Sequence, residues 1–599
     1  MSTNMEAPLT RAQIPARFRW NLRHIFRDAA ALKKGGEEIS KAAERLAALR
    51  GAAARDPLGA VKAYFELDRL LGEYYTYSHM LRDQDAGNDA YKAQMARADA
   101  LLLKAREASA FLRPELLTLP EERLRALAGD AGHPQYSVFF GDLLREKPHV
   151  LPQAQEELLA QCSEVFGTAG KTYRLLNAVD LPLPRVPGED GRETQMTHAN
   201  YGPLIRSADR KVRKAAFQGM MTAYGDFANT LSSLYIGSVK NDVLQAKLRA
   251  YPSAREAFLS PNRIPVSVYD GLLKETARAL PVLDRYLALR KKALKVDELH
   301  LYDLYTPIAR DFSMALPYPK AFRLVKMGLA PLGGEYGEHL ERAYRERWVD
   351  VFETPGKTPG AYSTSTFGSH PYVLLNHTDN LDGAMTLAHE LGHAMHSLYS
   401  DREQPFEKSD YSLFAAEVAS TCNEVLLNRA LTEEYRDDRE AKLYFLTSLA
   451  EHFRTTFFRQ TLFAEFEKES HRLEEAGEAL TEKRLSDLHL ALNRKYYGRE
   501  CEIDPEIRYE WLRIPHFYRA FYVYQYATGF SAAVFLADRI VKGGGTALSD
   551  YFRFLKSGGS LPPIEALRLA GADMEKPGVI RGAMKVFADT VTQMEALVP

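Results

Sequence analysis

The chain has 599 residues, with 78 Lys and Arg against 79 Asp and Glu, so its formal net charge is −1. This balance gives no general attraction to polyanions, and we expect no nucleic-acid partner. The three cysteines, Cys162, Cys422 and Cys501, are too far apart for a disulfide framework, which favours a reducing compartment. Because the sequence shows neither a secretory signal nor 18 consecutive apolar residues, we expect a cytoplasmic protein with no membrane partner.

Segments rich in Ala, Leu, Glu, Lys and Arg, with helical spacing of the apolar residues, follow one another along most of the chain. They predict helices over 37–49, 58–80, 90–112, 207–248, 267–295, 411–431, 441–475, 481–497 and 516–540. Two regions rich in Pro and Gly interrupt them, namely 178–204, which predicts a hairpin or an extended excursion, and 355–371. We therefore predict a mainly α fold, with a large helical body and one small β-sheet.

The stretch 386–396, Thr-Leu-Ala-His-Glu-Leu-Gly-His-Ala-Met-His, has the pattern of a metal-binding helix. His389 and His393 are four residues apart, which places them about 40° apart on one helical face. Glu390 lies between them, within reach of a bound water. The other positions are largely apolar, as in a core helix, where a polar group without a partner costs about 2–7 kcal/mol. Two histidine ligands and a carboxylate base are typical of zinc hydrolases, whereas the alternative is a pair of ordinary polar residues on a half-buried helix.

A catalytic zinc ion needs a third protein ligand, and the sequence offers two candidates. His396 lies seven residues after His389, about 10 Å along a continuous helix, and no glycine follows His393 to break that helix. We therefore expect His396 to be a packed or outer residue. Glu417 lies 24 residues beyond His393 on a small-residue helix, and the loop between them is long enough to return it. Glu424, on the same face, either orients a ligand histidine or is a solvated charge.

The apolar run 372–376, Tyr-Val-Leu-Leu-Asn, directly precedes the metal helix and is the best strand candidate in the chain. A strand at this place has two interpretations. Its edge could pair with the backbone of an extended peptide. Alternatively, it is a buried connecting strand, and the residues themselves favour neither interpretation.

Taken together, these residues resemble the oligoendopeptidase F family of zinc peptidases, in the superfamily of thimet oligopeptidase and neurolysin. The resemblance spans nearly the whole chain, through RWNL at 19–22, KLRAYPSAREA at 247–257, HELGH at 389–393, AEVAST at 416–421, IPHFY at 514–518 and YVYQYATG at 522–529. It implies one Zn²⁺ per chain on His389, His393 and Glu417, catalysis by Glu390, and cleavage of short unstructured peptides. It also implies a deep central channel that excludes folded proteins.

The segment 516–526 contains one histidine and four tyrosines. Tyr518, Tyr522 and Tyr526 recur every fourth residue, which is how a core aromatic stripe would look. Alternatively, these groups donate hydrogen bonds to the oxyanion of a tetrahedral intermediate. The resemblance favours the second interpretation, and we select His516, Tyr518, Tyr522 and Tyr524 as the candidate donors.

From this sequence we expect three regions: an N-terminal helical region at 1–125, a connecting helical and hairpin region at 126–200, and a zinc-peptidase catalytic domain at 201–599. The predicted function is endopeptidase cleavage of short peptides by a zinc-activated water. A zinc metallocarboxypeptidase and a non-catalytic helical peptide-binding protein are the alternatives. The sequence indicates neither the subsite preference nor the oligomeric state.

Overall fold

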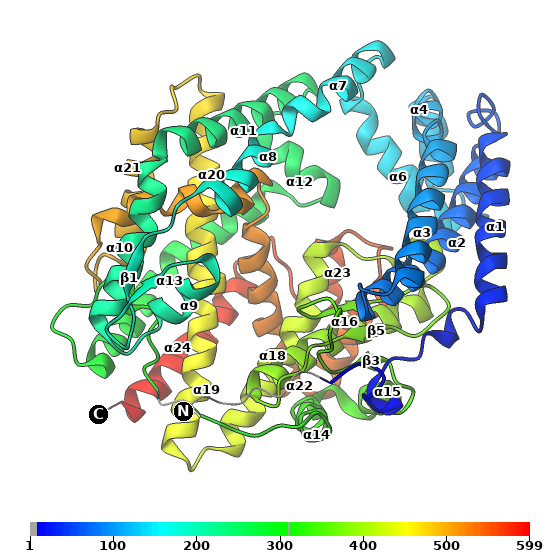
Figure 1. The fold of residues 1–599 in the computed structure, drawn as a ribbon. Coiled ribbons are helices and arrows are strands. Elements are labelled where there is room, and N and C mark those ends of the chain that lie inside the picture. The colour runs from blue at the N-terminus through cyan, green and yellow to red at the C-terminus, as the bar shows by residue number, and fades with distance from the viewer. Residues whose placement is uncertain (1–8, 310–311, 599) are drawn as a thin grey trace. The chain divides into compact units, whose positions relative to one another are not determined.

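The computed structural model describes residues 9–309 and 312–598 (Figure 1). Backbone contacts divide the chain into two compact units. The first comprises Met1–Lys147, Ser313–Ala430 and Leu536–Gly571, and the second comprises Pro148–Phe312, Leu431–Phe535 and Ala572–Pro599. Each unit is thus assembled from three separate stretches of sequence. The division into regions 1–125, 126–200 and 201–599 stays a prediction, as does the central channel.

The first unit contains helices and the larger sheet. Its elements are α1 (Ala29–Ala47), α2 (Pro57–Gln84), α3 (Asp89–Ser109), α4 (Leu112–Leu117), α5 (Glu121–Ala128), α6 (Ser137–Glu146), α14 (Tyr318–Gly328), α15 (Gly333–Arg345), β3 (Val349–Asp350), β4 (Tyr362–Thr364), β5 (Tyr372–Leu374), α16 (Leu381–Glu403), α17 (Phe406–Ser409), most of α18 (Leu413–Glu434), the C-terminal part of α22 (Tyr524–Ser557) and α23 (Pro563–Leu569).

The described residues of the second unit form helices and one hairpin. Its elements are α7 (Gln153–Phe166), α8 (Thr168–Leu175), β1 (Arg185–Pro187), β2 (Glu193–Gln195), α9 (His198–Ile205), α10 (Arg210–Asp226), α11 (Ala228–Leu248), α12 (Ala254–Leu259), α13 (Val266–Leu294), α19 (Arg439–His452), α20 (Arg459–Glu475), α21 (Glu482–Tyr497), the start of α22 and α24 (Gly578–Leu597). The hairpin of β1 and β2 confirms the one predicted within 178–204.

Helices α1, α2 and α3 lie side by side, as Figure 1 shows at the blue end of the chain. Polar side chains define where each begins: the Asp28 carboxylate accepts from the Ala31 amide, Asp56 from Gly59, and Asn88 from Ala90. Their facing sides bury Leu46 and Val61 completely. The helices predicted in this part of the chain are therefore confirmed, because capping and apolar spacing agree.

Three later helix predictions need correction, because the structure interrupts or shortens the predicted helix. The segment predicted as one helix over 207–248 is two helices, which meet at Phe227, where ψ is 15°. Between α19 and α20 the chain forms a π-helical stretch, Phe453–Phe458. The predicted helix over 516–540 is wrong in its first part, because α22 begins only at Tyr524 and a short 3₁₀ turn, Pro515–Tyr518, comes before it.

The small sheet of the first unit has the strand order β3-β5-β4, with β3 parallel and β4 antiparallel to β5. The strand predicted within 372–376 is confirmed as β5, and its three residues are fully buried. Both edges of β5 are paired, so the interpretation that β5 itself receives a peptide is wrong. Strand β4 lies against α16, and its outer edge has no strand partner within residues 9–309 and 312–598.

The mainly α fold is confirmed, with short strands confined to these two sheets in the described part of the chain. Across the same residues, none of the helices combines the length and the apolar composition that a bilayer crossing requires. Cys162, Cys422 and Cys501 are all free thiols.

Candidate metal centre

Helix α16 carries the predicted metal motif into the interior of the first unit. It begins at Asn380, whose side-chain oxygen accepts a hydrogen bond from the Gly383 amide at 3.0 Å. Leu387, Leu391 and Met395 have no exposed surface, which confirms the core helix expected from the apolar pattern. The two motif histidines are only half-buried, so they occupy the face of the helix that is open to a ligand.

His389, His393 and Glu417 bring one ligand atom each to a common point. Nε2 of His389 lies 3.2 Å from Nε2 of His393, and Glu417 Oε2 lies 3.5 Å and 3.6 Å from these two nitrogens. A tetrahedral zinc ion with bonds of about 2.0–2.1 Å would separate its ligand atoms by about 3.3 Å. The three atoms therefore match three corners of such a tetrahedron. They are also the only group of three potential metal ligands found among the described residues.

The side of this triangle nearest Glu417 is the open one. The Glu417 side chain is 46% exposed, against 27% for His389 and 18% for His393. A site with three protein ligands and one exposed side can admit a water or a substrate oxygen at the fourth position. Three protein ligands with an exposed side are typical of catalytic zinc sites, whereas structural sites are closed by four protein ligands.

Glu424 fixes the orientation of the His389 ring. Its Oε1 lies 2.5 Å from His389 Nδ1, so the nitrogen that points away from the site donates to a carboxylate. When the ring is neutral and its proton is on Nδ1, the Nε2 directed at Glu417 and His393 is unprotonated. Of the two alternatives left open by the sequence, the structure favours the orienting role over a solvated charge.

Gly392 and Asn423 allow α18 to approach α16 closely enough for Glu417 to reach the histidines. A Cβ on Gly392 would lie 2.6 Å from the Ser420 Cα and 2.8 Å from the Ala419 oxygen. Asn423 donates from Nδ2 to the Ala388 carbonyl oxygen at 3.0 Å and ties the two helices together. Sequence reasoning missed both residues, although a glycine inside an otherwise apolar helix is a signal of close packing.

The titratable groups of the site are tuned by their burial. Burial lowers the pKa of His393 to about 4, helped by the charge of His389, so its imidazole is neutral and able to ligate. Burial opposes the charged form of His389, but the hydrogen bond to Glu424 and the charges of Glu424, Glu390 and Glu417 together outweigh burial and raise the pKa of His389. Glu390 is 7% exposed, and burial raises its pKa to about 7, which suits a group that must take up and release a proton near neutral pH.

His396 belongs to the packing of α16. It is 1% exposed, and its ring stacks on that of Tyr411 with centroids 3.7 Å apart and an interplanar angle of 11°. Burial lowers the pKa of His396 to about 3. This position agrees with the packed role expected for it, since Glu417 occupies the third corner of the ligand triangle.

The four candidate oxyanion donors lie in the second unit, and they pack against different partners there. The His516 ring stacks on Tyr522 with centroids 5.9 Å apart, whereas Tyr518 stacks on Tyr173 at 4.5 Å. Tyr524 is 1% exposed, and its ring lies 5.0 Å from that of Tyr269 in the core. The regular stripe of tyrosines does not form, because the chain is not helical before Tyr524. The catalytic role of the four selected residues stays a prediction.

Two further residues shape this segment and were missed from the sequence. The Tyr526 hydroxyl lies 3.4 Å from His516 Nε2, so Tyr526 belongs with His516 and Tyr522. Phe521 adopts a left-handed conformation with φ of 52°, and its amide donates to the buried Glu467 carboxylate at 2.6 Å. A non-glycine residue in this region is strained, and such strain often occurs at functional segments.

Comparison with known proteins gives the following relatives. The model of peptidase family M3 matches residues 204–586, and that of oligopeptidase F matches residues 115–182. The chain is 42% identical to oligopeptidase PepF of Bacillus subtilis over 98% of this chain and 88% of that protein. It is 38% identical to group B oligopeptidase PepB of Streptococcus agalactiae, over 98% of both chains. The crystal structure of oligoendopeptidase-F from Enterococcus faecium is 36% identical, covers 94% of this chain and 97% of its own, and matches with a TM-score of 0.71.

Proposed function

Because this chain belongs to peptidase family M3, we propose that it is a zinc-dependent endopeptidase of the cytoplasm that hydrolyses internal bonds of short unstructured peptides. The observation that carries the proposal is the ligand triangle of His389, His393 and Glu417, with edges of 3.2–3.6 Å and one exposed side. A triangle of this size fits one Zn²⁺ ion and leaves room for a water.

A zinc ion held by these three residues would supply Lewis acidity toward the scissile carbonyl and would lower the pKa of water toward about 7. Glu390 takes the proton of the attacking water and passes it to the leaving nitrogen. Glu424, which contacts His389 Nδ1, keeps the His389 ring in the ligating tautomer. The reaction needs no covalent intermediate with the protein.

We propose that two further features of the chain contact the peptide substrate. The outer edge of β4, next to α16, would pair with the backbone of an extended peptide. Hydrogen-bond donors from His516, Tyr518, Tyr522 and Tyr524 would stabilise the oxyanion, at roughly 2.7–4 kcal/mol for each effective donor. Of these, His516 and Tyr522 are half-buried neighbours, which favours them over the enclosed Tyr524.

The decisive variant is Glu390→Gln. It removes the base and leaves the three ligands intact, so zinc should remain stoichiometric by elemental analysis while turnover of a quenched fluorescent peptide falls by at least about 1000-fold. If Glu390→Gln kept wild-type turnover, the proposed mechanism would be wrong.

A peptide blocked at both ends separates the alternatives. An endopeptidase cleaves it at internal bonds, and mass spectrometry then finds two blocked fragments. A metallocarboxypeptidase leaves the blocked peptide intact and trims single residues from an unblocked one. A non-catalytic peptide-binding protein would bind both peptides and cleave neither.

A further inference from the structure

We propose that the second unit contains a buried binding site for a small inorganic anion, of the class of chloride. The site is a cavity of about 30 Å³, lined by α20, α21, the π-helical stretch Phe453–Phe458, the 3₁₀ segment Pro505–Arg513 and parts of α9 and α10. Its polar lining comes from Tyr201, Tyr305, Arg454, Arg459, Asn493, Tyr497 and Arg513, with Glu510 as the lining carboxylate.

Positive charge exceeds negative charge around this cavity. Arg454 is 1% exposed and donates to Glu451 at 2.6 Å, and Arg290, equally buried, donates to the same carboxylate at 2.9 Å. Two more arginines, Arg459 and Arg513, lie beside a second carboxylate, that of Glu510. Four guanidinium groups therefore share two carboxylates. Arginine stays protonated in proteins, so these four groups carry about two more positive charges than the two carboxylates offset.

Glu510 is the second of these carboxylates. It accepts from Arg459 at 2.6 Å, and Arg513 lies 3.9 Å away from it. Its other oxygen faces His489 at 3.3 Å. Both oxygens are therefore already in use, and Glu510 offers no further negative charge to the cavity.

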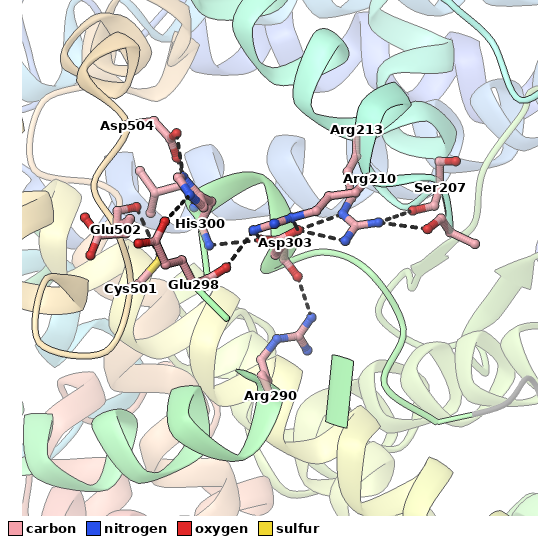
Figure 2. Close-up of polar contacts among 12 residues, drawn as sticks. Ser207, Arg210, Arg213, Arg290, Glu298, His300, Asp303, Cys501, Glu502 and Asp504 are labelled. Atoms are coloured by element: carbon pink, nitrogen blue, oxygen red, sulfur yellow. Dashed lines mark hydrogen bonds and ion pairs between the residues drawn. The ribbon is translucent and has the colours of Figure 1, made fainter. Parts of the chain in front are cut away.

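Two acids near this region, Asp303 and Asp504, are already paired, as Figure 2 shows. Asp303 accepts from Arg213 at 2.9 Å and also from Arg210, so two more guanidinium groups share one carboxylate there. Asp504 accepts from the His300 ring at 2.9 Å. Neither acid lines the cavity, and neither offsets its charge.

The hydroxyl groups of the lining add hydrogen-bond donors to the guanidinium groups. The Tyr497 hydroxyl is buried in a residue that is 3% exposed, and it has no hydrogen-bond partner in the described part of the chain. Burial raises the pKa of Tyr497 and of Tyr201 well above the ordinary value, so both stay protonated. A buried phenol without a partner is costly, and an anion among the guanidinium groups would accept a hydrogen bond from it.

The size of the cavity selects among anions. A single water needs about 10–15 Å³ of such space, so 30 Å³ holds about two water-sized groups. This accommodates a monatomic anion with one water.

Thermal unfolding of the full-length, zinc-loaded protein tests the site. Chloride is titrated against gluconate at constant ionic strength, and a specific site produces a saturable rise in Tm of about 2–4 °C. Tyr497→Phe and Arg513→Gln should lose this rise. Tyr496→Phe is the matched control, because the adjacent Tyr496 hydroxyl donates to Glu465 at 3.0 Å, and this variant should keep the rise.

Crystals of the same protein grown in bromide locate the ion. An anomalous peak within the cavity between Arg454 and Tyr497 supports the proposal, and its absence overturns it even if Tm rises. The proposal also fails if gluconate gives the same rise as chloride, or if Tyr497→Phe responds fully. Formate gives a further arm: a rise equal to that in chloride and lost in Tyr497→Phe would assign the site to carboxylates instead.

Discussion

Substituting Gly392 by alanine should remove zinc from the site without touching a ligand. The new Cβ would lie 2.6 Å from the Ser420 Cα, whereas carbon atoms in contact are ordinarily about 3.5–4.0 Å apart. The obstacles are backbone atoms of α18, which cannot rotate away as a side chain can. Helices α16 and α18 must therefore separate by about 1 Å.

This separation acts on the metal through Glu417, which lies one helical turn before Ser420. If Glu417 Oε2 retreats by about 1 Å, its distance to the metal grows from about 2.1 Å to about 3 Å, far beyond the tolerance of about 0.2 Å for a zinc ligand. Loss of an outer partner alone weakens metal binding 10–100-fold, so we expect a loss of at least about 100-fold for Gly392→Ala. Overpacking should also lower the free energy of unfolding by about 1–3 kcal/mol.

The assay is titration of the metal-free protein with zinc against a competing chelator, together with calorimetric unfolding. Gly72→Ala is the matched control, because Gly72 lies inside α2 and a Cβ there meets no atom within 4 Å. That variant should bind zinc normally and gain up to about 1 kcal/mol from helix propensity. Zinc affinity and kcat/KM within twofold of wild type in Gly392→Ala would refute the packing argument.

Three further predictions concern the carboxyl groups of Glu424, Glu417 and Glu467. Glu424→Gln should weaken zinc binding 10–100-fold, measured by chelator competition, because His389 loses its charged partner; unchanged affinity would mean that the contact does not orient the ring. Glu417→Ala should lose both zinc and turnover, and a zinc-replete, active variant would point to His396 as the third ligand. Burial raises the pKa of Glu467 from 4.5 to about 8, so the stability it contributes is fully present below about pH 4.5 and is lost as the pH rises through 8. The Tm of Glu467→Gln should therefore fall less than that of wild type between about pH 6 and pH 9, and parallel curves would contradict the assignment.

The local sequence pattern was sufficient to predict most of the helices and two of the three candidate metal ligands, His389 and His393. Apolar spacing and capping residues act within a few positions of each other, so α1, α2 and α3 follow from their own segments. The same holds for His389 and His393, because any residues four apart on a helix share a face. The shared face needs no knowledge of the rest of the chain.

Tertiary packing decided what local pattern could not. Glu417 becomes the third corner of the site only because Gly392 lets two helices meet at backbone contact, and His396 is excluded because its ring packs on Tyr411. The spacing of the tyrosines predicted a helix for the tyrosine-rich segment. Instead, the segment turns at Phe521, whose amide donates a hydrogen bond to Glu467, 54 positions earlier. Contacts between residues so distant in sequence leave no periodic signal, and they appear only when the chain is folded.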